Sequence, residues 1–326
     1  MLDILSRISI RNVPHEYGKP ILKGAISVPL SSNNFHSLRA IRDGKIGFVD
    51  GGNNIIFLSP GQAVHLVRLY YSIFDNGKKA EHGRYTFILN SFFKPSDESF
   101  SVEIYDVDSS NLLPERMEIN ESDIDEREKI KGIGAYIRRI GEWLLLERIL
   151  KKCEILVKDG SLQTGEKYEA PFAERVFNNV EDKVIIGFSK TCSIVTERGY
   201  SLLASVHHLS KTHGIEAPWY YHPIAKNITT IKGDMFVVKL HPYADYVFRV
   251  EVYPQEKIEK VGRLIPMAND PVFIGYPYGL IDADVNARIT DEEAKMYKNL
   301  LYNSADDFTR MQANALNAHD IISEVK

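Results

Sequence analysis

Two short apolar segments that each end in Asp-Gly constrain this chain more than any other feature. Residues 46–51 read Ile-Gly-Phe-Val-Asp-Gly, and residues 155–160 read Ile-Leu-Val-Lys-Asp-Gly. Short apolar runs of this kind are typical of strands that are buried on both faces of a sheet. Asp50 and Asp159 would then stand at the carboxyl ends of two strands, which is the edge where ligands bind in open α/β sheets.

The first of these segments also has a simpler interpretation. Asp-Gly between apolar runs is a strong hairpin signal, and residues 54–58 are a plausible return strand. On this segment alone the turn is the favoured interpretation. The two interpretations are compatible, because an acid at the mouth of a hairpin can still face a site. The second segment of the same form, which ends at Asp159, strengthens the interpretation of Asp50 as an acid at a ligand-binding edge.

The chain between the two acids predicts a β-meander followed by a long helix. Residues 46–105 hold successive runs rich in β-branched and aromatic residues, which are typical of strands. Residues 106–128 are acidic and polar, which predicts a solvated loop or insertion. Residues 130–150 have apolar side chains at helical spacing. A strand after such a helix is expected to lie parallel to the first, reached by a right-handed crossover, so that Asp50 and Asp159 become neighbours.

The chain after Asp159 predicts further α/β units. Residues 183–188 form a third apolar run, which places Lys190 at the same sheet edge as the two acids. Beyond it the patterns predict a helix over 196–208, a hairpin of strands 235–240 and 246–253, a helix over 256–264, a turn over 275–280, and helices over 281–289 and 290–302. Helical periodicity puts Asp282 and Asp284 on different faces, so only one of them should point into a site.

This order of elements is that of the ribonuclease H fold, an α/β fold with a mixed central sheet flanked by helices, here with insertions. The acids that fall at the expected places are Asp50, Glu142, Asp159 and one of Asp282 or Asp284. Glu147 lies on the same predicted helix as Glu142 and remains an alternative to it.

A carboxylate cluster of this kind predicts a metal ion. Two carboxylates about 4 Å apart repel by about 4 kcal/mol at an effective dielectric constant of about 20. Three or four together stay ionised at neutral pH only when a cation neutralises them. Oxygen ligands favour Mg²⁺ or Mn²⁺, and two such ions can hold the attacking water and the leaving oxygen of a phosphodiester in line. Lys190 would neutralise the phosphate or pair with one of the acids.

Charge and cysteine content narrow the classes of function. The formal net charge is −4, so no global field attracts DNA, and DNA binding would rely on a local basic groove or on metal ions. Cys153 and Cys192 form neither a metal-ligand pair nor a disulfide framework, which suits a reducing cytoplasm. No apolar run approaches the ~18 residues of a membrane span, so no membrane partner is expected.

The ordered motifs resemble the archaeal DNA repair nuclease family NurA over roughly residues 40–300. The segments that carry the resemblance are 48–52, 138–143, 157–162, 187–190 and 275–284. Asp-Gly-Ser-Leu from Asp159 and the Ser-Lys that ends at Lys190 are the most specific parts. The chain departs from the pattern at Gly52, where a serine is expected after Asp-Gly.

The resemblance implies a Mn²⁺-dependent deoxyribonuclease, with Mg²⁺ as an alternative and two ions bound. It implies 5′-to-3′ exonuclease activity on single strands and duplex ends, endonuclease activity on single strands, and DNA end resection in double-strand break repair and homologous recombination. The implied partners are DNA, the hexameric ATPase HerA and a second copy of the chain. The nuclease domain would span 45–303, with an N-terminal arm at 1–44 and a helical tail at 304–326. The implied metal ligands are Asp50, Glu142, Asp159 and Asp284. The expected place of Lys190 at the same sheet edge makes it a further candidate catalytic residue.

A few other residues are weaker candidates for DNA contacts. Arg138 is placed to contact phosphates, although an arginine on a helix surface is the commoner case. Tyr220, Tyr221 and His222 offer rings on which bases can stack, but packing in the core or an interface is the favoured interpretation. The competing functions are an actin-like ATPase or sugar kinase, and a non-catalytic adaptor for DNA or HerA on a nuclease core.

Overall fold

The computed structural model describes residues 16–124, 129–164, 168–229 and 231–314. Its strands are β1 Ile26–Ser27, β2 Phe35–Ser37, β3 Lys45–Ser59, β4 Gln62–Asp75, β5 Lys78–Lys94, β6 Ser99–Asp106, β7 Arg116–Asn120, β8 Ile155–Asp159, β9 Val184–Ser189, β10 Trp219–Tyr221, β11 Ala225–Lys226, β12 Asp234–Lys239 and β13 Phe248–Tyr253. Its α-helices are α2 Lys129–Ile149, α3 Ala170–Asn178, α4 Leu202–Thr212, α5 Tyr278–Ala287 and α6 Asp291–Ser304. Its 3₁₀ helices are η1 Ser32–Asn34, η2 Glu121–Asp123, η3 Leu150–Lys152 and η4 Gln255–Met267.

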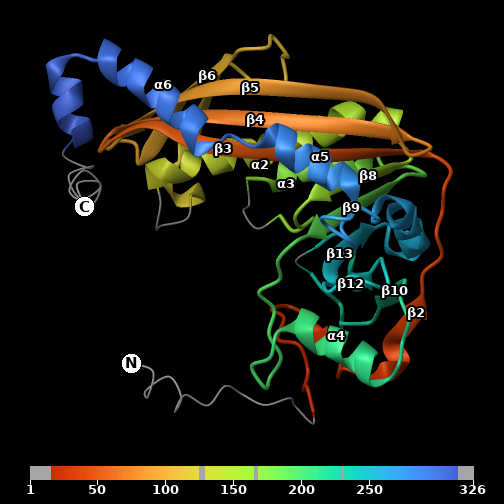
Figure 1. Cartoon of the computed structure of the whole chain (residues 1–326). Helices are drawn as coiled ribbons and strands as arrows, with labels where there is room; N and C mark the ends of the chain where they lie inside the picture. Colours follow the sequence, from red (N-terminus) through yellow and green to blue (C-terminus); the bar gives the residue numbers. More distant parts are fainter. Residues whose placement is uncertain (1–15, 125–128, 165–167, 230, 315–326) are drawn as a thin grey trace, which may run out of the picture.

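A mixed sheet of eleven strands, in the order β2-β10-β12-β13-β9-β8-β3-β4-β5-β6-β7, forms the centre of the molecule. β3 to β6 pair antiparallel in succession, which confirms the predicted meander. β3, β8 and β9 are parallel neighbours, as predicted, with Val49 opposite Lys158. β12 and β13 form the predicted antiparallel pair. The short strands β9 to β13 and helix α4 extend below the long strands in Figure 1.

Helices cover both faces of the sheet. α2 and α3 pack on one face, where Ile133, Ile137 and Ile140 of α2 join a buried cluster with side chains of β3 to β6. α5 and η4 pack on the other face over Phe48 and the inner strands, and α6 continues from α5 along the long strands (Figure 1). The two helical layers bury the parallel strands from both sides, which is why those strands are apolar throughout. Among the described residues, no helix is both long and apolar enough to cross a membrane.

The turn expected at Asp50-Gly51 is wrong. β3 continues through both residues to Ser59, and the turn to β4 lies at Pro60-Gly61. Gly52 has a structural reason to be glycine, because a Cβ there would lie 2.3 Å from the carbonyl oxygen of Ala287 in α5. Glycine here therefore allows α5 to approach the strand closely and does not mark a chain reversal.

Two other predictions, for the acidic segment 106–128 and for the helix expected from Thr196, differ from the structure. The acidic segment 106–128, which is expected from its sequence to be a solvated loop, includes the edge strand β7 with its buried Ile119. The charged residues beside Ile119 hide the alternation of apolar and polar residues that would predict this strand. Residues 125–128 lie outside the described part. The helix expected from Thr196 begins only at Leu202, where the Ser201 hydroxyl accepts a hydrogen bond from the Ala204 amide and caps it. The arm expected over 1–44 stays a prediction as a domain boundary; its residues 35–37 form β2 in the main sheet, and its residues 1–15 lie outside the described part.

The remaining predicted helices are present with shifted ends. The segment 256–264 lies within the 3₁₀ helix η4, and the helix expected over 281–289 begins earlier, at Tyr278. Thr290 caps α6 as expected, with its hydroxyl 3.2 Å from the Glu293 amide. Of the predicted tail 304–326, residues 307–314 are helical and residues 315–326 lie outside the described part.

Candidate active site

Three carboxylates meet where the parallel pairing of β3 and β8 ends. Asp50 lies in β3, Asp159 is the last residue of β8, and Asp284 lies in the second turn of α5. Each offers an oxygen atom, and these oxygens all lie within 4.8 Å of one another. The predicted closeness of Asp50 and Asp159 is confirmed, while the roles of the acids as metal ligands remain predictions.

Lys190 bridges two of the three acids. It follows β9 directly, and its Nζ lies 2.7 Å from an oxygen of Asp159 and 2.8 Å from an oxygen of Asp284. Burial alone would lower the pKa of Lys190, but the two carboxylates outweigh it and raise that pKa. Burial likewise would raise the pKa of Asp284, but Lys190 and the ion pair with Arg288 hold it below its usual value. This end of the cluster is therefore compensated by cations.

Asp50 is the acid that the protein compensates least. Its side chain is 8 % exposed, and its hydrogen-bond donor is the Gly51 amide at 2.7 Å. Burial, followed by the negative charges of Asp159 and Glu142, raises the pKa of Asp50 to about 8. A divalent cation at the cluster would remove this penalty, because it favours the ionised carboxylate.

The raised pKa of Asp50 predicts a pH dependence of stability in the metal-free protein. The folded state holds a proton on Asp50 that the unfolded chain loses above a pH of about 4, so the free energy of unfolding should fall as the pH rises to about 8. The slope due to this group is at most about 1.4 kcal/mol per pH unit. Urea unfolding in EDTA between pH 5 and 8 measures it, and Asp50→Asn should flatten the curve. Equal slopes in the wild type and the variant would contradict the prediction.

Glu142 lies beside the three acids but is held by two cations. It is 1 % exposed on α2, its Oε2 lies 2.7 Å from Lys158 Nζ, and its Oε1 accepts a hydrogen bond from Arg138. Burial would raise the pKa of Glu142, but Lys158 and Arg138 outweigh it and lower that pKa. The predicted role of Glu142 as a metal ligand stays a prediction. Any metal at Glu142 would share its oxygens with Lys158 and Arg138.

The structure also separates the alternative acids from the cluster. Glu147 pairs with Arg175 of α3 at 2.8 Å and is partly exposed. Asp282 is buried on the other side of α5, where it accepts a hydrogen bond from the Tyr70 hydroxyl at 3.0 Å and pairs with Lys79. Helical periodicity had placed Asp282 and Asp284 on different faces, and Asp284 is the one that joins Asp50 and Asp159.

Glu142→Gln and Glu147→Gln make a matched pair on one helix. Removing the charge of Glu142 leaves Lys158 buried and uncompensated, so the free energy of unfolding should fall by about 3 kcal/mol. Glu147→Gln removes an exposed ion pair and should change it by less than about 1 kcal/mol. Urea unfolding checks both values, and Mn²⁺ titration calorimetry on the same variants tests whether Glu142 contributes to metal binding. Equal stabilities would show that the buried charge network is unimportant.

The predicted DNA-contact residues are engaged within the protein. Tyr221 is fully buried, and its hydroxyl accepts a hydrogen bond from the Ser31 amide at 3.0 Å, so stacking of bases on Tyr221 is wrong and the packing interpretation holds. His222 pairs with Asp234 at 2.7 Å. Both lie at or next to β10, which β12, β13 and β9 separate from β8. Arg138 lies near the acids, but its guanidinium is bound to Glu142.

Glu251, a buried glutamate that no sequence pattern indicates, fixes the turn after Asp159. Glu251 of β13 is 1 % exposed and accepts hydrogen bonds from the Ser161 hydroxyl at 2.8 Å and the Leu162 amide at 2.6 Å. Gly160 supplies the left-handed backbone that this turn needs, with φ +92°. Glu251 reads as an ordinary strand residue in the sequence, because its partner is distant along the chain.

Tyr276 is a second residue that sequence reasoning did not select, although it lies in the motif Gly-Tyr-Pro-Tyr. Its ring lies 5.6 Å from Lys190 Nζ and packs against Phe188 and Phe248. Its buried hydroxyl has no hydrogen-bond partner among the described residues. The ring thus forms a wall of the site and holds Lys190 near the acids by a cation–π contact.

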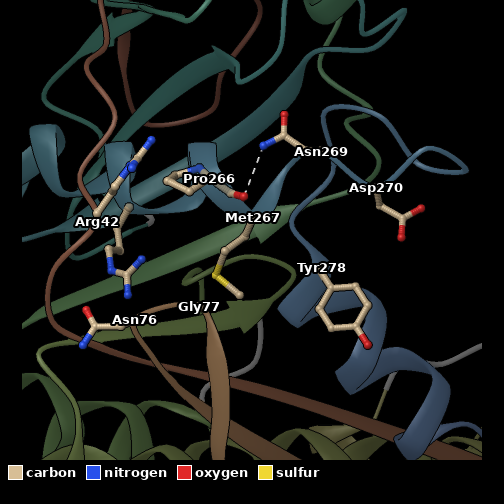
Figure 2. A pocket seen from close by; sticks show the side chains of 9 residues that line it. Arg42, Asn76, Gly77, Pro266, Met267, Asn269, Asp270 and Tyr278 are labelled. Atoms are coloured by element: carbon tan, nitrogen blue, oxygen red, sulfur yellow. Dashed lines mark hydrogen bonds between the residues drawn. The ribbon is translucent and has the colours of Figure 1, made fainter.

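Two cavities lie near this part of the molecule. One, of about 650 Å³, includes Lys190 and Asp284 in its lining and therefore opens onto the acid cluster. The other, of about 480 Å³, lies between Arg42, Asn76 and the segment around Met267 and Tyr278, as Figure 2 shows. The three clustered acids are not among the residues that line this second cavity, so only the first belongs to the candidate active site.

A comparison with solved structures finds the same fold in a nuclease. The crystal structure of the NurA nuclease from Sulfolobus solfataricus matches with a TM-score of 0.53 at 16 % identity, over 83 % of this chain and 87 % of that chain. Endonuclease V of Ciona intestinalis, in complex with inosine-containing DNA, matches with a TM-score of 0.41 at 11 % identity, over 77 % and 90 % of the two chains. No family model matches the chain, and no significant match is found among curated proteins. The likeness to NurA confirms the predicted fold, a ribonuclease H-like mixed sheet flanked by helices.

Proposed function

We propose that this chain is a metal-dependent deoxyribonuclease that hydrolyses phosphodiester bonds at Asp50, Asp159 and Asp284. The observation that carries the proposal is the meeting of three carboxylates, within 4.8 Å, at the carboxyl edge of the parallel strands. The NurA-like fold, shared with a protein described as a nuclease, supports it.

The donor set fits a hard divalent cation. All three groups are carboxylates, which suit Mg²⁺ and Mn²⁺ better than softer metals. Asp50 is buried with too little compensation, so the protein alone holds its charge poorly. A bound ion of this kind supplies an activated water and neutralises charge on the phosphate. Asp50, Asp159 and Asp284 would hold it, with Glu142 as a fourth candidate.

The protein groups around the acids orient the reacting phosphate. Lys190 lies at the open side of the cluster with its side chain 39 % exposed, so its ammonium can turn from Asp159 toward a phosphate oxygen. Arg288, on the same side, is also partly exposed and pairs with Asp284. The two cations supply the local positive charge that a chain of net charge −4 needs in order to bind DNA.

The finer assignment follows the resemblance to NurA. We propose Mn²⁺ as the preferred metal with two ions bound, 5′-to-3′ resection of DNA ends during double-strand break repair, activity on single strands, and action as a homodimer with the HerA ATPase. The support is the ordered motif set together with the NurA-like fold.

Digestion of DNA tests the proposal. Single-stranded and duplex substrates labelled at the 5′ or the 3′ end are incubated with Mn²⁺, with Mg²⁺ and with EDTA, in the presence and absence of HerA. We expect cleavage with the divalent metals and none with EDTA, with early loss of the 5′ label. No cleavage under any condition, combined with ATP binding by the isolated chain, would favour an ATPase of related fold instead.

A further inference from the structure

The cleft beside the acid cluster is lined mostly by side chains that have no role in the proposed hydrolysis. It measures about 650 Å³, within the range of small-molecule sites. The chain that follows β12, the segment before α5, and α5 itself provide its lining. Lys190 and Asp284 belong to both the cleft and the acid cluster, so whatever fills the cleft lies directly next to the reacting phosphate.

The outer wall of the cleft consists of exposed apolar and aromatic side chains. Tyr243 is 82 % exposed, Tyr246 is 70 % exposed and Phe273 is 54 % exposed. Val272 and Val285 are exposed beside them and line the same cleft. Large exposed apolar side chains around one cleft indicate a binding surface, because their exposure to water is unfavourable unless a ligand covers them.

We propose that this cleft holds an unpaired nucleobase of the DNA strand, next to the phosphate that the acids cleave. The inference rests on the proposed nuclease function. Aromatic rings stack on any base because every base has a π face. Lys190 and Arg288 at the edge of the cleft suit the negatively charged backbone on either side of that base. A protein covering the cleft would close the approach to the acids, which favours the substrate strand as the occupant.

The site predicts a preference for single-stranded DNA near the cleavage point. A base in a duplex is stacked and paired, so it must leave the helix before it can enter the cleft. A duplex end that frays, or a strand that is already single, avoids this penalty. The cleft therefore gives the active site a physical reason to act on unpaired nucleotides.

Abasic substrates test the cleft directly. In an Asp50→Asn background, which prevents cleavage, binding of a fluorescent single strand is measured with one abasic nucleotide moved along the sequence. The protein should lose about tenfold in affinity when the abasic nucleotide falls at one position, the effect of losing one stacking contact. Tyr246→Ala and Phe273→Ala, each added to this background, should weaken binding of the intact strand by about the same factor and abolish the effect of that abasic position.

Tyr105→Ala is the matched control, because Tyr105 is also 54 % exposed but lies on β6. It should leave binding and the abasic profile unchanged. If the affinity does not depend on the position of the abasic nucleotide while the wild type still cleaves DNA with metal, the proposal that the cleft holds a base is wrong and the proposed nuclease function stands. Variants that bind DNA normally but change the oligomeric state in light scattering would assign the surface to a second copy instead. A position-specific abasic effect without cleavage by the wild type would support the binding of a base in the cleft and contradict the proposed nuclease function.

Discussion

Asp50→Asn is expected to lower metal-dependent DNA cleavage by at least about a thousandfold while making the metal-free protein more stable. Asp50 is the most buried of the three clustered acids and the one whose charge the protein compensates least. Its loss would remove a proposed metal ligand, and a thousandfold effect corresponds to about 4 kcal/mol of transition-state stabilisation. At neutral pH the metal-free wild type must bind a proton on Asp50 when it folds, because the pKa of Asp50 is raised to about 8. Asparagine needs no such proton, so the folded metal-free variant should gain stability at neutral pH. Cleavage of end-labelled DNA and thermal unfolding in EDTA measure the two effects.

Asp282→Asn and Asp284→Asn extend this test along one helix. Asp284 belongs to the acid cluster, so its amide variant should lose activity as Asp50→Asn does. Asp282 instead binds Tyr70 and Lys79, so Asp282→Asn should reduce stability and keep cleavage near the wild-type rate. The opposite ranking of these two variants would show that the cluster is misassigned. Wild-type cleavage by Asp50→Asn would show that the reaction takes place elsewhere.

The parts of the site that the sequence predicted are those with a local signal. β8 and β9 are short apolar runs, and the order strand, helix, strand implies a parallel crossover, so the closeness of Asp50 and Asp159 followed from local patterns. The position of Lys190 followed in the same way. The resemblance to NurA favours Asp284, while helical periodicity alone leaves Asp282 as an alternative.

The parts that the sequence did not predict depend on contacts between distant segments. The Asp-Gly of β3 has the composition of a turn, but α5 packs against it and the strand continues. Lys158 lies in an apolar strand whose pattern indicates only that the strand is buried. Its ammonium nevertheless neutralises Glu142, which lies on α2. The hold of Glu251 on the turn after Asp159 and the aromatic wall around Tyr246 likewise come from elements far along the chain. No periodicity reports such pairings, because periodicity describes one segment at a time.

Gly52→Ser is expected to lower both stability and activity, although a serine is what the resemblance to NurA leads one to expect there. A Cβ at position 52 would lie 2.3 Å from the carbonyl oxygen of Ala287, well inside van der Waals contact. The clash is with backbone, so no side-chain rotation relieves it, and α5 must move away from β3. Overpacking of this kind lowers the free energy of unfolding by about 1–3 kcal/mol. Asp284 lies one turn before Ala287, so the shift carries it away from Asp50 and Asp159.

A displacement of Asp284 by about 1 Å is enough to reduce cleavage by about a hundredfold. Gly61→Ser is the control, because Gly61 lies in the turn that ends β3 and a Cβ there meets no atom within 4 Å among the described residues. It should leave stability and activity close to the wild type. Urea unfolding and DNA cleavage by the two variants compare the effects, and a fully active, fully stable Gly52→Ser protein would show that α5 does not position Asp284. If the loss occurs as expected, the close approach of α5 explains why this chain departs from the expected serine.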